Sequence, residues 1–319
     1  MYAPHELNIN SALSREDIRT VFEEAYEKGL AVTKNGKVAD YIPALAHADP
    51  SAFGIAAMFP DGEMITFGDV DTRFSMQSVS KTVTLLAALE CKGFDETFSH
   101  VMMEPTGDAF NSIIKLDTRS DLPFNPMINA GAIQVTSLLV DTFSFEDLLQ
   151  FARKLCLDDG ITLNETIYKS EFETGDRNRA IVYLLSSKGV LQADPKKTLD
   201  MYFKMCSLNV TAKSLAGLGI VIANNGVDPF TGKRLLDPNN VRILKNLMFT
   251  CGMYDFSGEY GMRVGVPSKS GVGGGVVCAA KLPLGIGFYG PSLDPSGNSI
   301  AAVHAMEHIS DSLGLHTFG

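Results

Sequence analysis

Ser78 and Lys81 are the residues whose types and spacing best fit covalent chemistry. They lie where a predicted strand gives way to a helix, and residues three apart on a helix share one face, so the amine can reach the hydroxyl. Partial burial beside other cations lets a lysine lose its proton and act as a base. Backbone N–H groups at a helix start favour negative charge on an attacked carbonyl oxygen. The pair predicts a serine nucleophile, although S-x-x-K also occurs where Ser caps a helix and Lys is solvated.

A second element, Lys269-Ser270-Gly271, falls in a late strand region and is followed by glycines at 273–275. Serine hydrolases of the β-lactamase and penicillin-binding type combine S-x-x-K with a Lys-Thr-Gly or Lys-Ser-Gly strand. Glycine at such a strand lets the substrate approach the backbone closely. The two elements together favour a catalytic interpretation of Ser78.

Tyr254 lies between these elements, in the segment Cys251–Gly258 with its flanking turn residues. A tyrosine there can relay a proton to a leaving nitrogen, with its hydroxyl bonded to the ammonium groups of Lys81 and Lys269. Taken alone, Tyr254 is typical of a half-buried packing residue. The order of the three motifs favours the relay.

The composition fits a soluble folded protein, with 319 residues of which 45% are hydrophobic and 20% charged. A formal net charge of −10 would repel a phosphate backbone, so we expect no nucleic-acid partner. No stretch reaches the ~18 apolar residues of a membrane helix, and the first thirty residues lack a signal-peptide pattern. We therefore expect a cytoplasmic protein with no membrane partner.

Neither the cysteines nor the histidines predict a metal or a cofactor. The five cysteines are scattered in apolar runs without a C-x-x-C spacing, and so indicate reduced core residues. His304 and His308 match the H-x-x-E-H pattern of inverted zincin proteases. Only Asp311 follows as a further acid ligand, so a solvated helix face is the favoured interpretation.

The hydrophobic periodicity predicts an α/β (α+β) protein with a sheet that is discontinuous in sequence. We expect terminal helices at Ser14–Gly29 and 299–313, and an early β-hairpin around Pro60-Asp61-Gly62. The expected late strands are Gly261–Val266, Gly275–Ala280 and Leu284–Tyr289. The expected helices between them are 79–89, 144–155, 177–187, 195–205, 211–224 and 240–250. Residues 1–90 and 251–319 would form a sheet lobe, residues 91–250 an inserted helical lobe, and the site would lie in the cleft between the lobes.

The sequence resembles the glutaminase family over about residues 40 to 310. Several separate blocks agree in order and spacing, in addition to the three motifs above. They are Tyr41–Pro43, Asn125–Ala132, Ser170–Glu171, Gly175–Asn178 and Tyr202–Phe203 with Cys206–Ser207. The resemblance implies a β-lactamase-like fold, an antiparallel sheet flanked by terminal helices, and hydrolysis of glutamine through a glutamyl-serine intermediate. It also suggests a homodimer or homotetramer.

The resemblance assigns Ser78 as nucleophile, Lys81 as base and Tyr254 as proton relay. It implies that the substrate contacts Asn129, Glu171, Asn178, Tyr202 and the backbone N–H of Val272, with Tyr41 and Gln77 close by and with Lys269, Ser270 and Gly271 in support. The chemistry of glutamine agrees, because its ammonium needs a carboxylate, such as Glu171, and its carboxylate needs neutral donors. The alternative for the Asn and Glu residues is a turn or capping role.

Two other functions use the same residues. A β-lactam or peptide hydrolase would share Ser78 and Lys81, but the sequence lacks the Ser-Asp-Asn element of such enzymes. A catalytically silent amino-acid sensor would have no need of Ser78, Lys81 and Tyr254 together. The sequence therefore favours a glutaminase.

Overall fold

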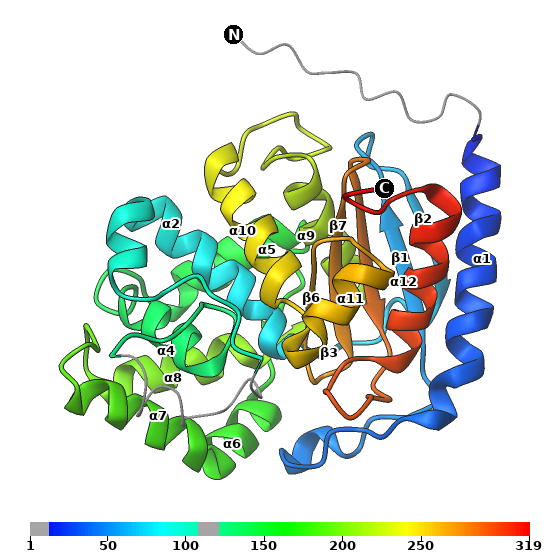
Figure 1. Ribbon diagram of the computed structural model, residues 1–319. Helices are drawn as coiled ribbons and strands as arrows, with labels where there is room; N and C mark the ends of the chain where they lie inside the picture. The colour runs from blue at the N-terminus through cyan, green and yellow to red at the C-terminus, as the bar shows by residue number, and fades with distance from the viewer. Residues whose placement is uncertain (1–12, 108–120) are drawn as a thin grey trace, which may run out of the picture.

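The computed structural model describes residues 13–107 and 121–319. Within these ranges five strands form an antiparallel sheet in the order β2-β1-β8-β7-β6 (Figure 1). The strands are β1 (Gly54–Met58), β2 (Met64–Gly68), β6 (Ser268–Ser270), β7 (Gly275–Ala280) and β8 (Leu284–Tyr289). The predicted hairpin is present as β1 and β2, and β1 pairs on its other side with β8, with Gly54 opposite Tyr289. The discontinuous sheet expected from the sequence is confirmed.

Helices cover both faces of this sheet. Helices α1 (Arg15–Val32) and α12 (Ile300–Leu313) pack side by side on one face, to the right of the sheet in Figure 1. Helix α9 (Ala212–Ala223) packs on the other face against β8, β7 and β1. The backbones of α9 and β8 approach each other so closely that a Cβ added to Gly285 would lie 1.9 Å from Ile220 N.

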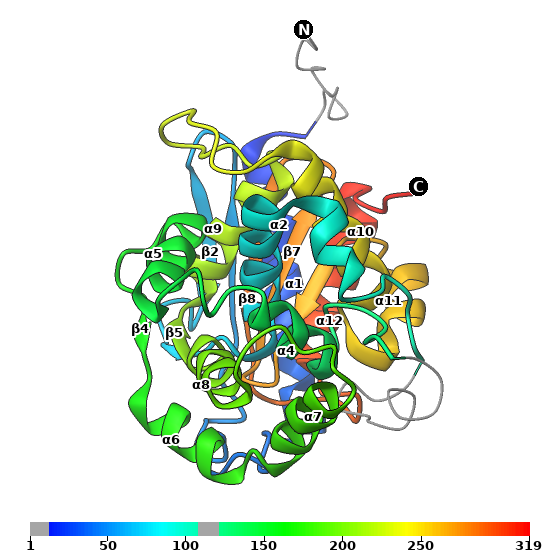
Figure 2. The same ribbon diagram turned by 90° about the vertical axis from the view of Figure 1, so that its left-hand side faces the viewer.

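The remaining helices are α2 (Ser80–Ser99), α4 (Asn129–Ser137), α5 (Phe145–Cys156), α6 (Glu165–Thr174), α7 (Asp176–Ser187), α8 (Pro195–Cys206), α10 (Pro238–Cys251) and α11 (Ser257–Arg263). Of these, α11 lies beside α12, with Arg263 paired to Glu307, and the others lie on the α9 side of the sheet, away from the terminal pair (Figure 2). Helix α9 belongs to the stretch 91–250 but packs on the sheet. This stretch therefore contacts the sheet through α9 as well as forming the group of helices beyond it. The division into a sheet lobe and a helical lobe stays a prediction.

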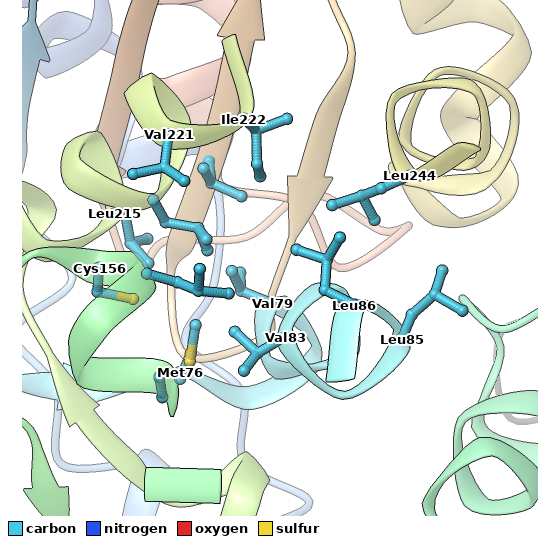
Figure 3. Close-up of a cluster of buried hydrophobic side chains, with 14 of the residues drawn as sticks. Met76, Val79, Val83, Leu85, Leu86, Cys156, Leu215, Val221, Ile222 and Leu244 are labelled. Carbon is cyan, nitrogen blue, oxygen red and sulfur yellow. The ribbon is translucent and has the colours of Figure 1, made fainter. Parts of the chain in front are cut away.

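Helix α2 runs through the largest apolar core and so fixes the elements beside it. Val79, Val83 and Leu86 lie among side chains of α9 and α10, such as Leu215 and Leu244, with Met76 at the end of the preceding segment (Figure 3). A small antiparallel sheet of β3 (Phe74–Ser75), β5 (Leu208–Val210) and β4 (Thr162–Leu163) holds that segment. The start of α2 is thereby anchored on both sides.

Two expectations about local structure are corrected. The predicted strand Gly261–Val266 is wrong, because Ser257–Arg263 is helix α11 and the strand that follows is Ser268–Ser270. The buried residues of this helix, Ser257 and Tyr260, are three apart, which is a helical spacing that the short apolar alternation after Tyr260 concealed. Helices α4 and α6 were not among those expected.

No helix in the described ranges is long and apolar enough to cross a membrane.

Candidate active site

Ser78 lies in a 3₁₀ turn, Gln77–Val79, directly before α2, rather than within the α-helix itself. The turn is held to the small sheet because Met76 N donates to Leu208 O at 2.8 Å. Gln77 has a φ of 47°, in the left-handed region that few side chains adopt. The segment thus presents the Ser78 side chain, which is 6% exposed, at the end of a buried helix.

Lys81 follows one turn later and is 1% exposed. Its Nζ donates to Met127 O at 3.1 Å and to Asn129 Oδ1 at 2.8 Å. Burial lowers the pKa of Lys81 to about 8, and negative charge on Cys206 and Glu171 would act in the opposite direction. An amine with this pKa can accept a proton near neutral pH.

Tyr254 brings a phenol to the same place from the segment after α10. Its φ is 58°, again left-handed. Burial raises the pKa of Tyr254, while the nearby hydroxyls of Ser78 and Ser270 and the N–H of Val272 act in the opposite direction. The Tyr254 hydroxyl therefore lies beside the predicted nucleophile and beside Val272.

Lys269 contacts Tyr254 in a different way from the one predicted. Its Nζ donates to Gly252 O at 3.0 Å and to Ser270 O at 2.6 Å, and it lies 4.5 Å from the centroid of the Tyr254 ring. The lysine thus meets the face of the ring rather than the hydroxyl. The predicted hydrogen bond between Lys269 and the Tyr254 hydroxyl is wrong, because β6 places the Lys269 amine over the face of the Tyr254 ring.

Val272 follows the end of β6, where the chain is pressed against the Ser75–Ser78 segment. A Cβ on Gly271 would lie 2.8 Å from Met76 O, and one on Gly273 would lie 2.3 Å from Ser75 O. The glycines on both sides therefore permit an approach that other residues would block. This close packing sets the position of the Val272 N–H relative to Ser78.

A pocket of about 270 Å³ opens over Ser78. Its lining residues are Tyr41, Ile42, Gln77, Ser78, Asn129, Glu171, Thr174, Gly175, Arg177, Asn178, Tyr202 and Cys206. It contains all the predicted substrate contacts except Tyr254 and Val272, which lie next to Ser78. The size suits one small polar molecule.

The polar groups of this pocket are arranged in two sets. Glu171 of α6 is buried and accepts a bond from Gln77 Nε2 at 3.3 Å. Burial raises the pKa of Glu171 to about 8, while the bond from Gln77 and the charge of Lys81 act in the opposite direction. Asn129 Nδ2 donates to Asn178 Oδ1 at 2.9 Å, which links the two amides. The pocket thus offers one acid, several neutral donors and the guanidinium group of Arg177.

Five lining residues were not predicted as contacts: Ile42, Thr174, Gly175, Arg177 and Cys206. Four of them lie inside the family-like blocks of the sequence, so three of these blocks contribute more residues to the pocket than predicted. Asn125 is not among the predicted contacts. Its side-chain oxygen accepts hydrogen bonds from Met127 N and Ile128 N, which is the role of a turn residue.

The histidine pair of α12 lies away from this pocket. His308 Nε2 is 3.0 Å from Glu24 Oε2 of α1, so this histidine bridges the two terminal helices. Among the described residues no three His, Cys, Asp or Glu side chains are placed to hold a metal ion.

Known proteins with a similar sequence or structure are glutaminases. The sequence model of the glutaminase family matches residues 36–318. Glutaminase 2 of Clostridium perfringens is 46% identical over 305 residues, which are 94% of this chain and 100% of the relative. A solved structure described as the probable glutaminase ybaS superposes with a TM-score of 0.91 at 35% identity, covering 96% of this chain and 99% of the other. A Bacillus subtilis glutaminase, solved as a covalent complex with 5-oxo-L-norleucine, gives a TM-score of 0.85 at 33% identity, covering 94% and 99%.

Proposed function

The chain belongs to the glutaminase family, whose members are amidohydrolases of the serine β-lactamase-like fold acting on glutamine, and we propose that it works through a covalent glutamyl–Ser78 intermediate. The observation that carries this proposal is the grouping of Ser78, the Lys81 amine and the Tyr254 hydroxyl beside one small polar pocket. In the first step Ser78 Oγ attacks the side-chain carbonyl carbon, and Lys81 Nζ accepts the hydroxyl proton.

The collapse of the resulting tetrahedral intermediate needs an oxyanion hole and a proton donor. The N–H groups of Ser78 and Val272 stabilise the negative oxygen. Tyr254 passes the proton held by Lys81 to the amide nitrogen, the C–N bond breaks and ammonia leaves. Water then attacks the ester and gives one proton to Lys81, which returns it to Ser78 Oγ as the ester bond breaks and glutamate is released.

The two sets of polar groups divide the recognition of the amino acid between them. The Glu171 carboxylate pairs with the substrate ammonium, and Asn129, Asn178, Tyr202 and Tyr41 donate to the substrate carboxylate. Tyr41 is 53% exposed and lies at the open side of the pocket. A volume of about 270 Å³ favours a free amino acid over a peptide or a β-lactam.

The covalent complex of the Bacillus subtilis glutaminase supports a nucleophile on the protein, because 5-oxo-L-norleucine has the carbon skeleton of a glutamyl group lengthened by one carbon. Treating the present protein with 6-diazo-5-oxo-L-norleucine and mapping the added mass by peptide mass spectrometry tests this directly. We expect the label on the peptide with Ser78. A label on another residue would show that Ser78 is not the nucleophile.

An ammonia-release assay distinguishes the other functions. With L-glutamine, L-asparagine and a chromogenic β-lactam measured side by side, we expect fast release from glutamine alone. Turnover of the β-lactam would favour the peptidase-like alternative, and binding of glutamine without turnover would favour the sensor.

Assembly and location stay predictions. We propose a homodimer or homotetramer, supported by the family resemblance, and we propose the cytoplasm as its location. Light scattering at several protein concentrations tests the first, and fractionation of the source cells tests the second.

A further inference from the structure

Lys269 is a fully buried amine for which the proposed mechanism has no step. It is the central residue of β6 and is 0% exposed. In the part of the chain that the structure describes, its acceptors are the carbonyl oxygens of Gly252 and Ser270, and no carboxylate pairs with it. Two acceptors match the two N–H groups of a neutral amine, and burial together with the charge of Lys81 lowers the pKa of Lys269 well below its ordinary value. A buried polar group of this kind is retained at a cost, which calls for a role.

Two of the groups that Lys269 contacts, the Gly252 carbonyl and the Tyr254 ring, belong to one turn, Gly252–Tyr254. The turn is held tightly, because Gly252 O also accepts from Ser270 N at 3.1 Å and a Cβ on Gly252 would lie 1.8 Å from Ser268 O. At the end of the turn Tyr254 has a left-handed backbone conformation. This conformation costs free energy for a tyrosine and persists only where the surrounding structure fixes it. The lysine amine at 4.5 Å supports the face of the same ring.

We propose that Lys269 is a positioning residue for the proton relay: its amine ties the Gly252 carbonyl to β6 and supports the Tyr254 ring, which keeps the phenol beside Ser78. This proposal rests on the proposed role of Tyr254 as the proton relay to the amide nitrogen. It therefore assigns Lys269 to the expulsion of ammonia and not to glutamine binding. Lys269 does not line the substrate pocket. Its loss should therefore lower kcat and leave KM within about threefold of wild type.

The test compares an amide with an ester that share the same glutamyl group. Ammonia needs a proton in order to leave, whereas the phenolate of L-glutamate γ-(4-nitrophenyl) ester leaves without one. We expect Lys269→Met to lower kcat/KM about 10- to 100-fold for glutamine, as small misplacements of a catalytic group do. The ester should lose less than about threefold, because its acylation needs no relay.

Lys269→Gln is the second variant. It keeps N–H donors on a shorter side chain that reaches only one of the carbonyls, so its amide-selective loss should be smaller than that of Lys269→Met. If Lys269→Met does not fold, this variant decides alone. Lys245→Met is the matched control, since Lys245 is also a lysine bonded to a carbonyl and an amide oxygen, Ala223 O and Asn225 Oδ1, but away from the site. It should keep the wild-type amide-to-ester ratio.

Tyr254→Phe, measured in parallel, separates the two levels of the proposal. An amide-selective loss in Tyr254→Phe with a wild-type ratio in the folded Lys269 variants would overturn the role of Lys269 alone. Equal losses for amide and ester in Tyr254→Phe would overturn the relay itself. Amide-selective losses in both residues, at unchanged KM, are the expected result.

Discussion

Glu171 and Lys81 are buried close enough to influence each other electrostatically, and removal from water disfavours the charged form of each. The pKa of each is displaced to about 8, upward for Glu171 and downward for Lys81. For an acid the rise favours the neutral form, and for an amine the fall also favours the neutral form. The pocket near neutral pH thus holds less charge than its residue types suggest, and the proposed binding of the substrate ammonium would add a cationic partner for Glu171.

The raised pKa of Glu171 predicts that glutamine binding releases a proton. Below pH 8 the free carboxyl is mostly protonated, whereas the bound ammonium requires the carboxylate, so affinity should rise with pH and level off above about 8. Calorimetric titration of Ser78→Ala with glutamine, in buffers of different ionisation enthalpy, measures both effects. Glu171→Gln should bind about 2–5 kcal/mol more weakly and without proton release. Glu165→Gln, an acid at the other end of the same helix, is the control. Affinity that does not change between pH 6 and 8 would contradict this.

The Ser78–Lys81 pair predicts non-additive losses. Ser78→Ala and Lys81→Ala should each lower kcat by at least about 10³-fold, and the double variant should be no slower than the worse single one. Lys92→Ala, an exposed lysine of the same helix, should keep normal activity. Initial-rate ammonia release and thermal melts together give the answer. Additive losses, or one well-folded variant with substantial turnover, would show that the two side chains act separately.

Sequence reasoning did well for residues that lie near each other in the chain and less well for those joined only in space. Ser78 and Lys81 are linked by helical spacing, and the resemblance placed Glu171 and Asn178 correctly around the pocket. The left-handed φ of Gln77 and the position of Lys269 behind the ring are set by contacts with other segments, which no local pattern encodes. Residue type alone suggested the Tyr254 hydroxyl as the partner of Lys269, but the position of Lys269 in its strand places the amine against the Tyr254 ring.

At the scale of the elements, the position of the proposed oxyanion hole depends on how closely β6 and its following loop approach the Ser75–Ser78 segment. The early helices and the hairpin were predictable because capping residues and turn glycines mark their ends. The β6 region was misjudged because a three-residue strand carries too little alternation to outweigh its neighbours. Its register comes instead from pairing with β7, with Lys269 opposite Val277.

Gly273→Ala tests this close approach. The added methyl would lie 2.3 Å from Ser75 O, so the loop must shift away from the nucleophile. We expect a loss of about 1–3 kcal/mol in the free energy of unfolding and a fall in kcat of about 10- to 100-fold, with KM little changed. Gly258→Ala in α11 has no heavy atom within 4 Å of its new Cβ and should be neutral or stabilising. Denaturant unfolding and steady-state rates provide both quantities, and an active, stable Gly273→Ala would show that the approach is not critical.

At the scale of the whole molecule, the site draws one group from each of several distant segments. Ser78 precedes α2, Glu171 belongs to α6, Tyr202 to α8 and Val272 follows β6. A ligand that bridges these groups can bind only when all the segments are in place. Binding and global stability are therefore linked.

Ser78→Ala with saturating glutamine should unfold at a higher temperature than without it. At about 100 times the Kd the gain is about 2.7 kcal/mol, which is a shift of several degrees for a protein of this size. The same concentration of asparagine should give a much smaller shift, because its side chain is one carbon shorter. Glu171→Gln in the same background should lose most of the stabilisation. Equal shifts for both amino acids in scanning calorimetry would speak against a site that measures side-chain length.

The pairing of β1 with β8 also has a kinetic consequence. Strand β1 is synthesised early and finds β2 at once, but the strand on its other side is one of the last parts of the chain to leave the ribosome. At ~5–20 residues per second, that edge waits roughly 10 to 50 s with its backbone groups unpaired. An apolar strand with an open edge is a site for wrong pairing between nascent chains. A chaperone that covers this edge should therefore raise the yield of active protein more than any change at the active site.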